Sequence, residues 1–214
     1  ISVTREGKGT TTYTYDESGN FLSSVTGENG GTSYMEYDAR GNLIITKDAS
    51  GAVTKYEYDL MNRVSKIINP NGGEICYTYD IYGNIASQTD ALGNVTTYIY
   101  DVGGRQIQTI YADGSSESYT YDSDSSVTSV TLSDGRKITY EYDVLGNLIK
   151  TTYPDGTTEE STYDITGQIT SITDAANNTT LYNYDSLGNI TGITLPEGQS
   201  LTATYDGKTN YVTG

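Results

Sequence analysis

Apolar and polar positions alternate along this chain in a unit that returns about every 21 residues. Each unit contains a stretch with tyrosines two residues apart and a polar residue between them, as in Tyr119-Thr120-Tyr121. Apolar residues then follow six and nine positions after the second tyrosine, as at Val127 and Val130. Alternation with period two is typical of a strand with one sheltered face, and a step from two to three is what a β-bulge causes. Because no segment of ten or more residues keeps helical periodicity, the sequence predicts an all-β protein.

A Tyr-Asp pair marks the same point of every unit. Successive pairs lie 22 residues apart once and 21 residues apart eight times. The pairs are Tyr15-Asp16, Tyr37-Asp38, Tyr58-Asp59, Tyr79-Asp80, Tyr100-Asp101, Tyr121-Asp122, Tyr142-Asp143, Tyr163-Asp164, Tyr184-Asp185 and Tyr205-Asp206. Ten copies in this register indicate one array over residues 1–214, built of about ten repeats without linkers. Because the chain begins at Ile1 and not at Met, we expect it to be a fragment of a longer protein.

Two turn signals separate the strands. The first is Asp-x-x-Gly, in which Asp accepts a backbone hydrogen bond and Gly supplies a positive φ. Its glycines are Gly19, Gly41, Gly83, Gly104, Gly146, Gly167 and Gly188. The second signal lies ten residues later, and all three prolines, Pro70, Pro154 and Pro196, take its second position. Repeats three and six have Asn62 and Ser125 in place of the first-turn glycine, so we expect local irregularity there.

Each repeat is therefore predicted to be one β-hairpin, and the tandem hairpins to form a continuous curled antiparallel sheet, an open β-spiral. A sheet of roughly twenty strands does not stay flat, since strand twist accumulates. The partner strand of each hairpin is expected to begin at the apolar residue six positions after the tyrosine of the pair, at Phe21 in the first repeat. With 22 Tyr, one Phe and no Trp, apolar packing must be largely tyrosine packing, on one sheltered face.

Composition and charge exclude several classes of function. The chain has 28 acidic and 12 basic residues, a formal net charge of −16, which argues against nucleic acid as a partner. It has no His, so no His-based catalytic group and no His-bearing zinc site can form. Cys76 is the single cysteine, expected to be a buried or half-buried free thiol in a strand, and no intrachain disulfide is possible. No apolar run approaches the length of a membrane span. We expect no cofactor and no enzymatic activity.

Four sharper readings of the residues remain as alternatives. The row of repeated aspartates could be metal ligands or catalytic carboxylates, but an active site occurs once, so turn capping is favoured. Asp122-Ser123-Asp124 resembles the start of a calcium loop, yet the required Gly is missing and Ser133 stands where the Glu belongs. Glu159 and Glu160, an adjacent acidic pair, could serve glycoside hydrolysis. Neighbours in a strand should point to opposite faces, which argues against that activity. The tyrosine rows could stack carbohydrate or peptide ligands; a sheltered sheet face is favoured.

The pattern Tyr-Asp-x-x-Gly-Asn, as in the segment Tyr142-Asp143-Val144-Leu145-Gly146-Asn147, resembles the YD/RHS repeat over essentially the whole chain. That family includes bacterial polymorphic toxins, the cocoon-forming components of insecticidal Tc toxin complexes, wall-associated proteins and teneurins. The resemblance implies a spiral of β-hairpins that winds into a hollow shell, which in toxins encloses a C-terminal effector. The core segment with an aspartate self-cleavage site, which precedes that effector in toxins, has no match here.

From the resemblance we expect a structural role, as part of the shell of a secreted or cell-surface bacterial protein of the toxin-encapsulation, delivery or wall-associated type. The implied partners are further repeats of the parent chain and an encapsulated C-terminal effector. The alternative is an adhesin-like module that binds a glycan or another cell-surface ligand. Because terminal strands present unpaired backbone groups, end-to-end self-association is also expected.

Overall fold

In the computed structural model, residues 2–4 and 9–206 are described, and the strands run through all of this part of the chain. The strands are β1 (Ser2–Thr4), β2 (Thr10–Tyr15), β3 (Leu22–Thr26), β4 (Thr32–Tyr37), β5 (Leu43–Lys47), β6 (Val53–Tyr58), β7 (Val64–Ile68), β8 (Glu74–Tyr79), β9 (Ile85–Thr89), β10 (Val95–Tyr100), β11 (Gln106–Ile110), β12 (Ser116–Tyr121), β13 (Val127–Thr131), β14 (Lys137–Tyr142), β15 (Leu148–Thr152), β16 (Thr158–Tyr163), β17 (Ile169–Thr173), β18 (Thr179–Tyr184), β19 (Ile190–Thr194) and β20 (Ser200–Thr202). The described residues contain no helix, which confirms the all-β prediction.

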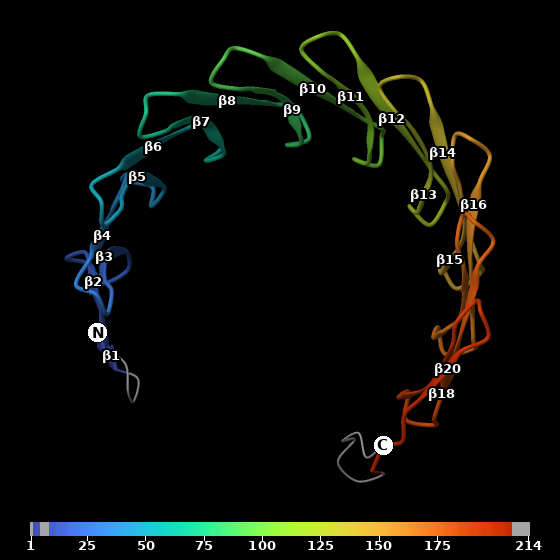
Figure 1. The fold of residues 1–214 in the computed structure, drawn as a ribbon. Helices are drawn as coiled ribbons and strands as arrows, with labels where there is room; N and C mark the ends of the chain where they lie inside the picture. Colours follow the sequence, from blue (N-terminus) through green and yellow to red (C-terminus); the bar gives the residue numbers. More distant parts are fainter. Residues whose placement is uncertain (1, 5–8, 207–214) are drawn as a thin grey trace. The chain divides into compact units, whose positions relative to one another are not determined.

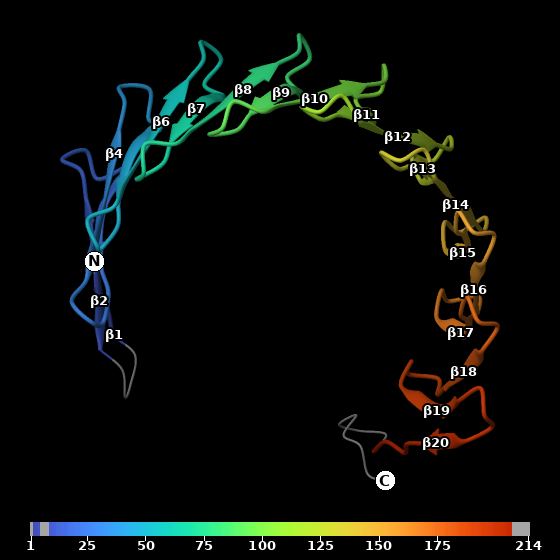
Figure 2. The same cartoon turned by 45° about the horizontal axis from the view of Figure 1, so that its top comes forward.

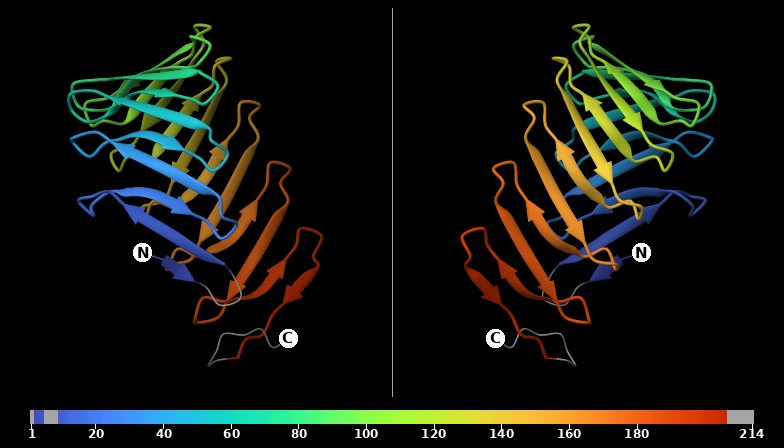
Figure 3. Two further views of the ribbon diagram at one scale, coloured as in Figure 1. Left: turned by 90° about the vertical axis from the view of Figure 1, so that its left-hand side faces the viewer. Right: turned by 90° about the vertical axis from the view of Figure 1, so that its right-hand side faces the viewer.

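The strands fall into two compact units, which are described separately. The first comprises Ile1–Ile99 and Ile110–Gly114, and the second comprises Tyr100–Thr109 and Ser115–Gly214. Strands β1 to β10 pair antiparallel in chain order, and so do β12 to β20. Figures 1 and 2 show this order. In Figure 3 the strands of the first unit are seen best in the left view and those of the second unit in the right view. The predicted antiparallel hairpin array is thus confirmed within each unit; one array over residues 1–214 stays a prediction.

A β-bulge lies in the hairpins that are closed by the first turn. In the hairpin of β12 and β13, Tyr119 pairs with Val130 and Tyr121 pairs with Val127, with a register shift between them. Two residues of the bulged strand therefore oppose one on its partner: the Thr120 hydroxyl lies 2.8 Å from that of Thr128 and 2.7 Å from that of Ser129. Apolar residues three apart can in this way face tyrosines two apart. The bulge predicted from the step in the pattern is confirmed.

Both turn signals fold into the same backbone shape. In the first turn Gly41 N–H donates to the carbonyl of Asp38 at 3.0 Å, and in the second Gly51 N–H donates to that of Asp48 at 2.9 Å. The fourth residue of each turn has a positive φ, which Gly adopts without strain. The expected irregularity of repeats three and six is wrong, because Asn62 and Ser125 take up the same conformation with φ of 61° and 69°. Asn177 does so in a second turn, at 63°.

The first repeat departs from the predicted strand start. The strand begins at Leu22, which pairs with Tyr15, and Phe21 lies in the turn region, where its carbonyl accepts from Asp16 N–H at 2.8 Å. In the second repeat the corresponding acceptor is Asn42, one residue nearer to its aspartate. Phe21 is thus the additional residue behind the single spacing of 22, and its ring packs against Tyr37 at a centroid distance of 4.9 Å.

The structure has no fully buried apolar core among the described residues. The buried residues are Thr109, Ser129 and Thr151, whereas the tyrosines are mostly half-buried and Tyr15 and Tyr34 are exposed. The expectation of a sheltered tyrosine face is wrong in degree, because each unit is a single-layered sheet. Stability therefore depends on cross-strand contacts and hydrogen bonds more than on a closed interior.

Candidate functional site

The tyrosine of the Tyr-Asp pair joins each hairpin to the one before it. This tyrosine ends its strand, and its hydroxyl donates to the carbonyl of the residue 15 positions earlier, where the preceding bulged strand begins. In the second unit, for example, the Tyr142 hydroxyl lies 3.0 Å from the Val127 carbonyl oxygen. Tyrosines that make this bond, at 2.6–3.1 Å, are Tyr37, Tyr58, Tyr79, Tyr121, Tyr142, Tyr163, Tyr184 and Tyr205.

The aspartate of the pair caps its own turn. Asp143 Oδ1 accepts from the backbone N–H groups of Leu145 and Asn147, each at 2.9 Å, and Oδ2 accepts from the Asn147 side-chain amide at 2.9 Å. The same three contacts recur in the turns of Asp38, Asp80 and Asp185. Each carboxylate is thereby occupied by its own loop, which leaves it poorly suited to bind a substrate.

These hydrogen bonds hold the turn carboxylates in the ionised form. The side-chain amide of Asn147, followed by the backbone N–H of the same residue, lowers the pKa of Asp143 below its ordinary value. The Thr166 hydroxyl, ahead of the backbone N–H of Gln168, lowers the pKa of Asp164. The pKa of the paired tyrosines shifts the other way: burial of the ring raises the pKa of Tyr58 and Tyr142. At neutral pH the pair is a charged cap beside a neutral phenol.

In two repeats an arginine replaces the asparagine that lies four residues after the paired aspartate. The contacts of this arginine were not predicted from the sequence. Arg63 pairs with Asp59 at 2.7 Å and lies over the Tyr79 ring of the next hairpin, 4.1 Å from its centroid. Arg105 pairs with Asp101 at 2.7 Å and lies 4.9 Å from the centroid of the Tyr121 ring. The signal available in the sequence was an Arg four residues after the paired Asp and 16 before the next paired Tyr.

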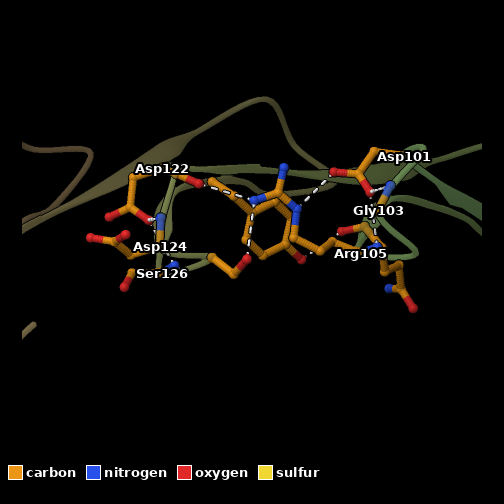
Figure 4. A network of polar contacts seen from close by, with 9 residues as sticks. Asp101, Gly103, Arg105, Asp122, Asp124 and Ser126 are labelled. Atoms are coloured by element: carbon orange, nitrogen blue, oxygen red, sulfur yellow. Dashed lines mark hydrogen bonds and ion pairs between the residues drawn. The ribbon is translucent and has the colours of Figure 1, made fainter.

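Arg105 also bridges two consecutive turns. Its Nη1 donates to the Asp122 carbonyl at 3.0 Å, so that the guanidinium lies between the turns at Asp101 and Asp122 (Figure 4). The Asp122 carboxylate accepts from the N–H groups of Asp124 and Ser126, both at 2.9 Å. The segment that resembles a calcium loop is therefore a capped turn of the common kind. Within residues 2–4 and 9–206, no group of three or more His, Cys, Asp or Glu side chains gathers as metal ligands would.

Two carboxylates stand on the tyrosine face of the second unit. The Tyr119 hydroxyl donates to Glu117 at 3.1 Å, and the Tyr153 hydroxyl donates to Glu159 at 2.8 Å. Burial, with the Glu117 bond second, raises the pKa of Tyr119, and the Glu159 bond raises the pKa of Tyr153. Their strands β12 and β16 lie four strands apart, about 19 Å, beyond the ~5–9.5 Å of a glycosidase pair.

The opposite face of the sheet carries acid–lysine–acid contacts. Lys150 pairs with Glu160 at 2.9 Å, and Glu141 lies across the strand pair from Lys150. Because Glu159 contacts Tyr153 on the other face, the prediction that Glu159 and Glu160 point apart is confirmed. In the first unit Lys66 pairs with Glu74 at 3.1 Å, and the neighbouring Cys76 is half-buried as predicted.

The tyrosines, aspartates and glycines of the repeat motif thus occupy equivalent places in their hairpins. They are distributed along the hairpins and do not converge on one centre. The glycines of the first turn, from Gly19 to Gly188, lie at the fourth turn position, and the aspartates from Asp16 to Asp185 begin those turns. Tyr205 ends the described series with its bond to the Ile190 carbonyl at 2.9 Å. In the described part of the chain no helix is long and apolar enough to span a membrane.

Comparison with known protein families gives a direct match. The family model described as RHS Repeat matches five tandem segments, at residues 15–53, 37–74, 79–116, 121–158 and 163–200. These segments cover well over half of the chain, and each begins at a tyrosine of the Tyr-Asp series. No curated protein matches the sequence.

Solved structures share the fold. The structure of TcdB2-TccC3-Cdc42 matches with a TM-score of 0.57 and 16% identity over 92% of this chain and 13% of that chain. The Tc holotoxin pore of Photorhabdus luminescens matches with a TM-score of 0.60 and 17% identity over 94% of this chain and 14% of that chain. The protein is therefore similar in fold to a stretch of these chains, about one seventh of their length.

Proposed function

Because the chain belongs to the RHS-repeat family, we propose that it forms a structural segment of the β-hairpin shell of a secreted or cell-surface bacterial protein. The observation that carries this proposal is the contact between neighbouring hairpins. The same hydrogen bond, from a tyrosine hydroxyl to a backbone carbonyl, recurs with a period of 21 residues. A wall needs equivalent contacts at regular intervals, whereas an enzyme needs a single active site that differs from the rest of the repeats. The activity we propose is therefore containment and display, without catalysis.

We place the shell in the toxin-encapsulation and delivery class, with a wall-associated protein as its nearest variant. The shared fold with parts of Tc toxin chains supports this class. Further repeats of the parent chain would extend the wall at both ends, and a C-terminal effector would be the enclosed partner. A net charge of −16 would keep an open, tyrosine-rich wall soluble.

Imaging of the full product of the encoding gene by electron cryomicroscopy tests the proposal. We expect a hollow shell with these hairpins in its wall, and an enclosed segment that resists added protease until the shell is unfolded. A solid particle or an extended rod, with every segment open to protease, would overturn the assignment. The protease assay has an internal control, because exposed turn loops on the outside of the wall should be cut at the same rate in folded shell and in isolated repeats.

A second candidate is an adhesin-like module that binds glycans or proteins on the tyrosine face. The half-buried state of Tyr56 and Tyr77, with no described apolar residue fully buried, favours it, because their rings remain available for stacking. A glycan array followed by titration tests it. Saturable binding that is lost in a Tyr56→Ala, Tyr77→Ala variant, but kept in Tyr82→Ala at a turn tip, would favour this candidate. Binding that is absent, or equal in all three proteins, would exclude it.

A further inference from the structure

One edge of each unit carries a row of exposed apolar side chains. The row lies at the second and third positions of the first turn, directly after the aspartate of the pair. In the second unit Val144 and Ile165 are 102% and 94% exposed, and Leu145 and Leu187 are also exposed. In the first unit the row consists of Leu60, Met61, Ile81 and Tyr82. We call these residues the first-turn row.

The opposite edge is chemically different, although its turns have the same backbone shape. Its corresponding positions hold small, polar or proline residues, such as Ala49, Pro70, Ser133 and Pro154. Leu92 is the large apolar residue among its exposed tips. The turn geometry therefore does not demand apolar tips, and side chains of this size gain nothing from complete exposure to water. The first-turn row needs an explanation outside the hairpins themselves.

In the second unit the surroundings of the row are acidic. In the three successive turns at residues 143–147, 164–168 and 185–189, each tip follows an aspartate and no Lys or Arg is present. Turn hydrogen bonds lower the pKa of Asp143, Asp164 and Asp185, so these carboxylates stay charged at neutral pH. Two first-turn rows brought together would place like charges opposite each other, which opposes pairing with a second copy. A partner that matches this edge is apolar and cationic.

The spacing of the tips narrows the partner further. Successive tips are two strands apart, about 9.6 Å at the usual strand separation. An α-helix rises ~10.5 Å over seven residues, so apolar residues on its heptad positions fall in step with three successive tips to within about 2 Å. In a β-strand, residues three apart (~10 Å) would point to opposite faces.

We propose that the first-turn row is a docking edge for a cationic amphipathic α-helix, which lies along the edge and crosses the hairpins. Its apolar stripe contacts Val144, Ile165 and Leu187 in the second unit. Its Lys and Arg residues flank the stripe and face the turn aspartates. This surface is separate from the tyrosine face, and the inference does not depend on the shell function.

The test uses a labelled 21-residue helical peptide with Leu at heptad positions a and d and Lys at e and g, titrated by fluorescence anisotropy. The variant replaces the second-unit part of the row by serine, through Val144→Ser, Leu145→Ser, Ile165→Ser and Leu187→Ser. We expect saturable binding to the unaltered chain and on the order of tenfold or greater weakening in the variant. Leu92→Ser, equally exposed on the other edge, is the matched control and should bind as the unaltered chain does.

Three results would overturn the proposal. One is equal binding by the serine variant, and another is equal binding of a peptide with the same composition but with its six Leu residues spread around the helix instead of on one stripe, since charge alone would then explain the affinity. The third is dimerisation of the unaltered chain, lost in the variant when followed by sedimentation, which would make a second copy the occupant. Should the four-fold variant unfold, Ile165→Lys alone must weaken binding, because it places a positive charge under the helix.

Discussion

Eight tyrosines of the Tyr-Asp pairs, from Tyr37 to Tyr205, are held by their hydroxyls as well as by their rings. A phenyl ring would fill the same space on the sheet, yet the chain contains 22 Tyr and one Phe. The hydroxyl supplies a partner for a carbonyl at the start of the preceding bulged strand, for example at Val127. This explains why the position is tyrosine although no apolar residue of the described chain is fully buried.

Replacement of Tyr142 by Phe should therefore destabilise the fold by about 0.5–1.5 kcal/mol, the net value of one hydrogen bond. Urea unfolding followed by circular dichroism measures the change. Tyr140→Phe is the matched control, because Tyr140 lies two residues earlier on the same strand and face and makes no such bond to the backbone. Equal loss of stability in both variants would show that the Tyr142 hydroxyl bond contributes nothing.

The glycine of the first turn is a second residue with a local duty. Gly146 has a φ of 84°, which a β-branched residue adopts only under strain. Gly146→Val should lower the free energy of unfolding by about 1–3 kcal/mol, and Gly146→Asn by less, since Asn62 and Asn177 already occupy this conformation. Leu145→Val in the same exposed turn is the control. An unchanged unfolding midpoint for Gly146→Val would contradict the assigned geometry.

The turn aspartates make stability dependent on pH. The folded-state pKa of Asp143 is depressed, so its stabilising effect is fully present above the unfolded pKa and is lost as the pH falls through the folded value. The Asp143→Asn variant should melt below the unaltered chain at neutral pH. The gap in midpoints should close progressively as the pH is lowered through the ordinary carboxyl pKa value of 3.8 and further. A gap that is constant over this range would show that the carboxylate charge plays no part.

At the scale of the element, the strands were predictable because their pattern has a direct geometric cause. The step from two to three between Val127 and Val130 implies a bulge, and the bulge lies there. The strand start at Phe21 was wrong because the count from the tyrosine cannot tell an inserted turn residue from a strand residue. The irregularity expected at Ser125 was wrong too, since its turn keeps the capping bonds of Asp122, while the Arg105 guanidinium braces it from the preceding hairpin.

A hairpin should be removable as a unit, because each one contacts mainly its neighbours. Deletion of residues 143–163 joins Tyr142 to Asp164 and restores a Tyr-Asp pair one period earlier. We expect this protein to keep the β-sheet spectrum and cooperative unfolding at a lower midpoint. Deletion of residues 143–152 instead joins Tyr142 to Tyr153 and removes a turn with its strand, so it should abolish cooperative unfolding. Similar behaviour of the two deletions would refute the hairpin as the unit of folding.

At the scale of the whole molecule, the class of fold could be predicted from the sequence, but the degree of burial could not. The class of fold and the repeat unit follow from periodicity. The degree of burial does not, because alternation reports which residues share a face and not whether a second layer covers it; Tyr56 and Tyr77 are consequently half-buried instead of buried. The apolar residues Val144 and Ile165 can be seen in the sequence, but only the structure shows that their side chains are exposed and form a surface row.

The charge excess should also show in the salt dependence of stability. Sixteen unbalanced negative charges repel one another, and the ion pairs among the described residues, such as Lys150 with Glu160, are few beside them. Raising NaCl from about 20 mM to about 500 mM should screen this repulsion and raise the thermal midpoint by a few degrees. Glycerol in place of salt controls for general solvent effects. A midpoint that falls with salt would mean that the ion pairs outweigh the repulsion.

The hydroxyl bond between hairpins has a polarity that bears on synthesis. Its donor always belongs to the later hairpin and its acceptor to the earlier one, as with Tyr163 and the Leu148 carbonyl. During translation the acceptor therefore leaves the ribosome first, and every new hairpin meets a finished template to which it can fasten. Growth of the sheet from its N-terminal side needs no residue that has yet to be made.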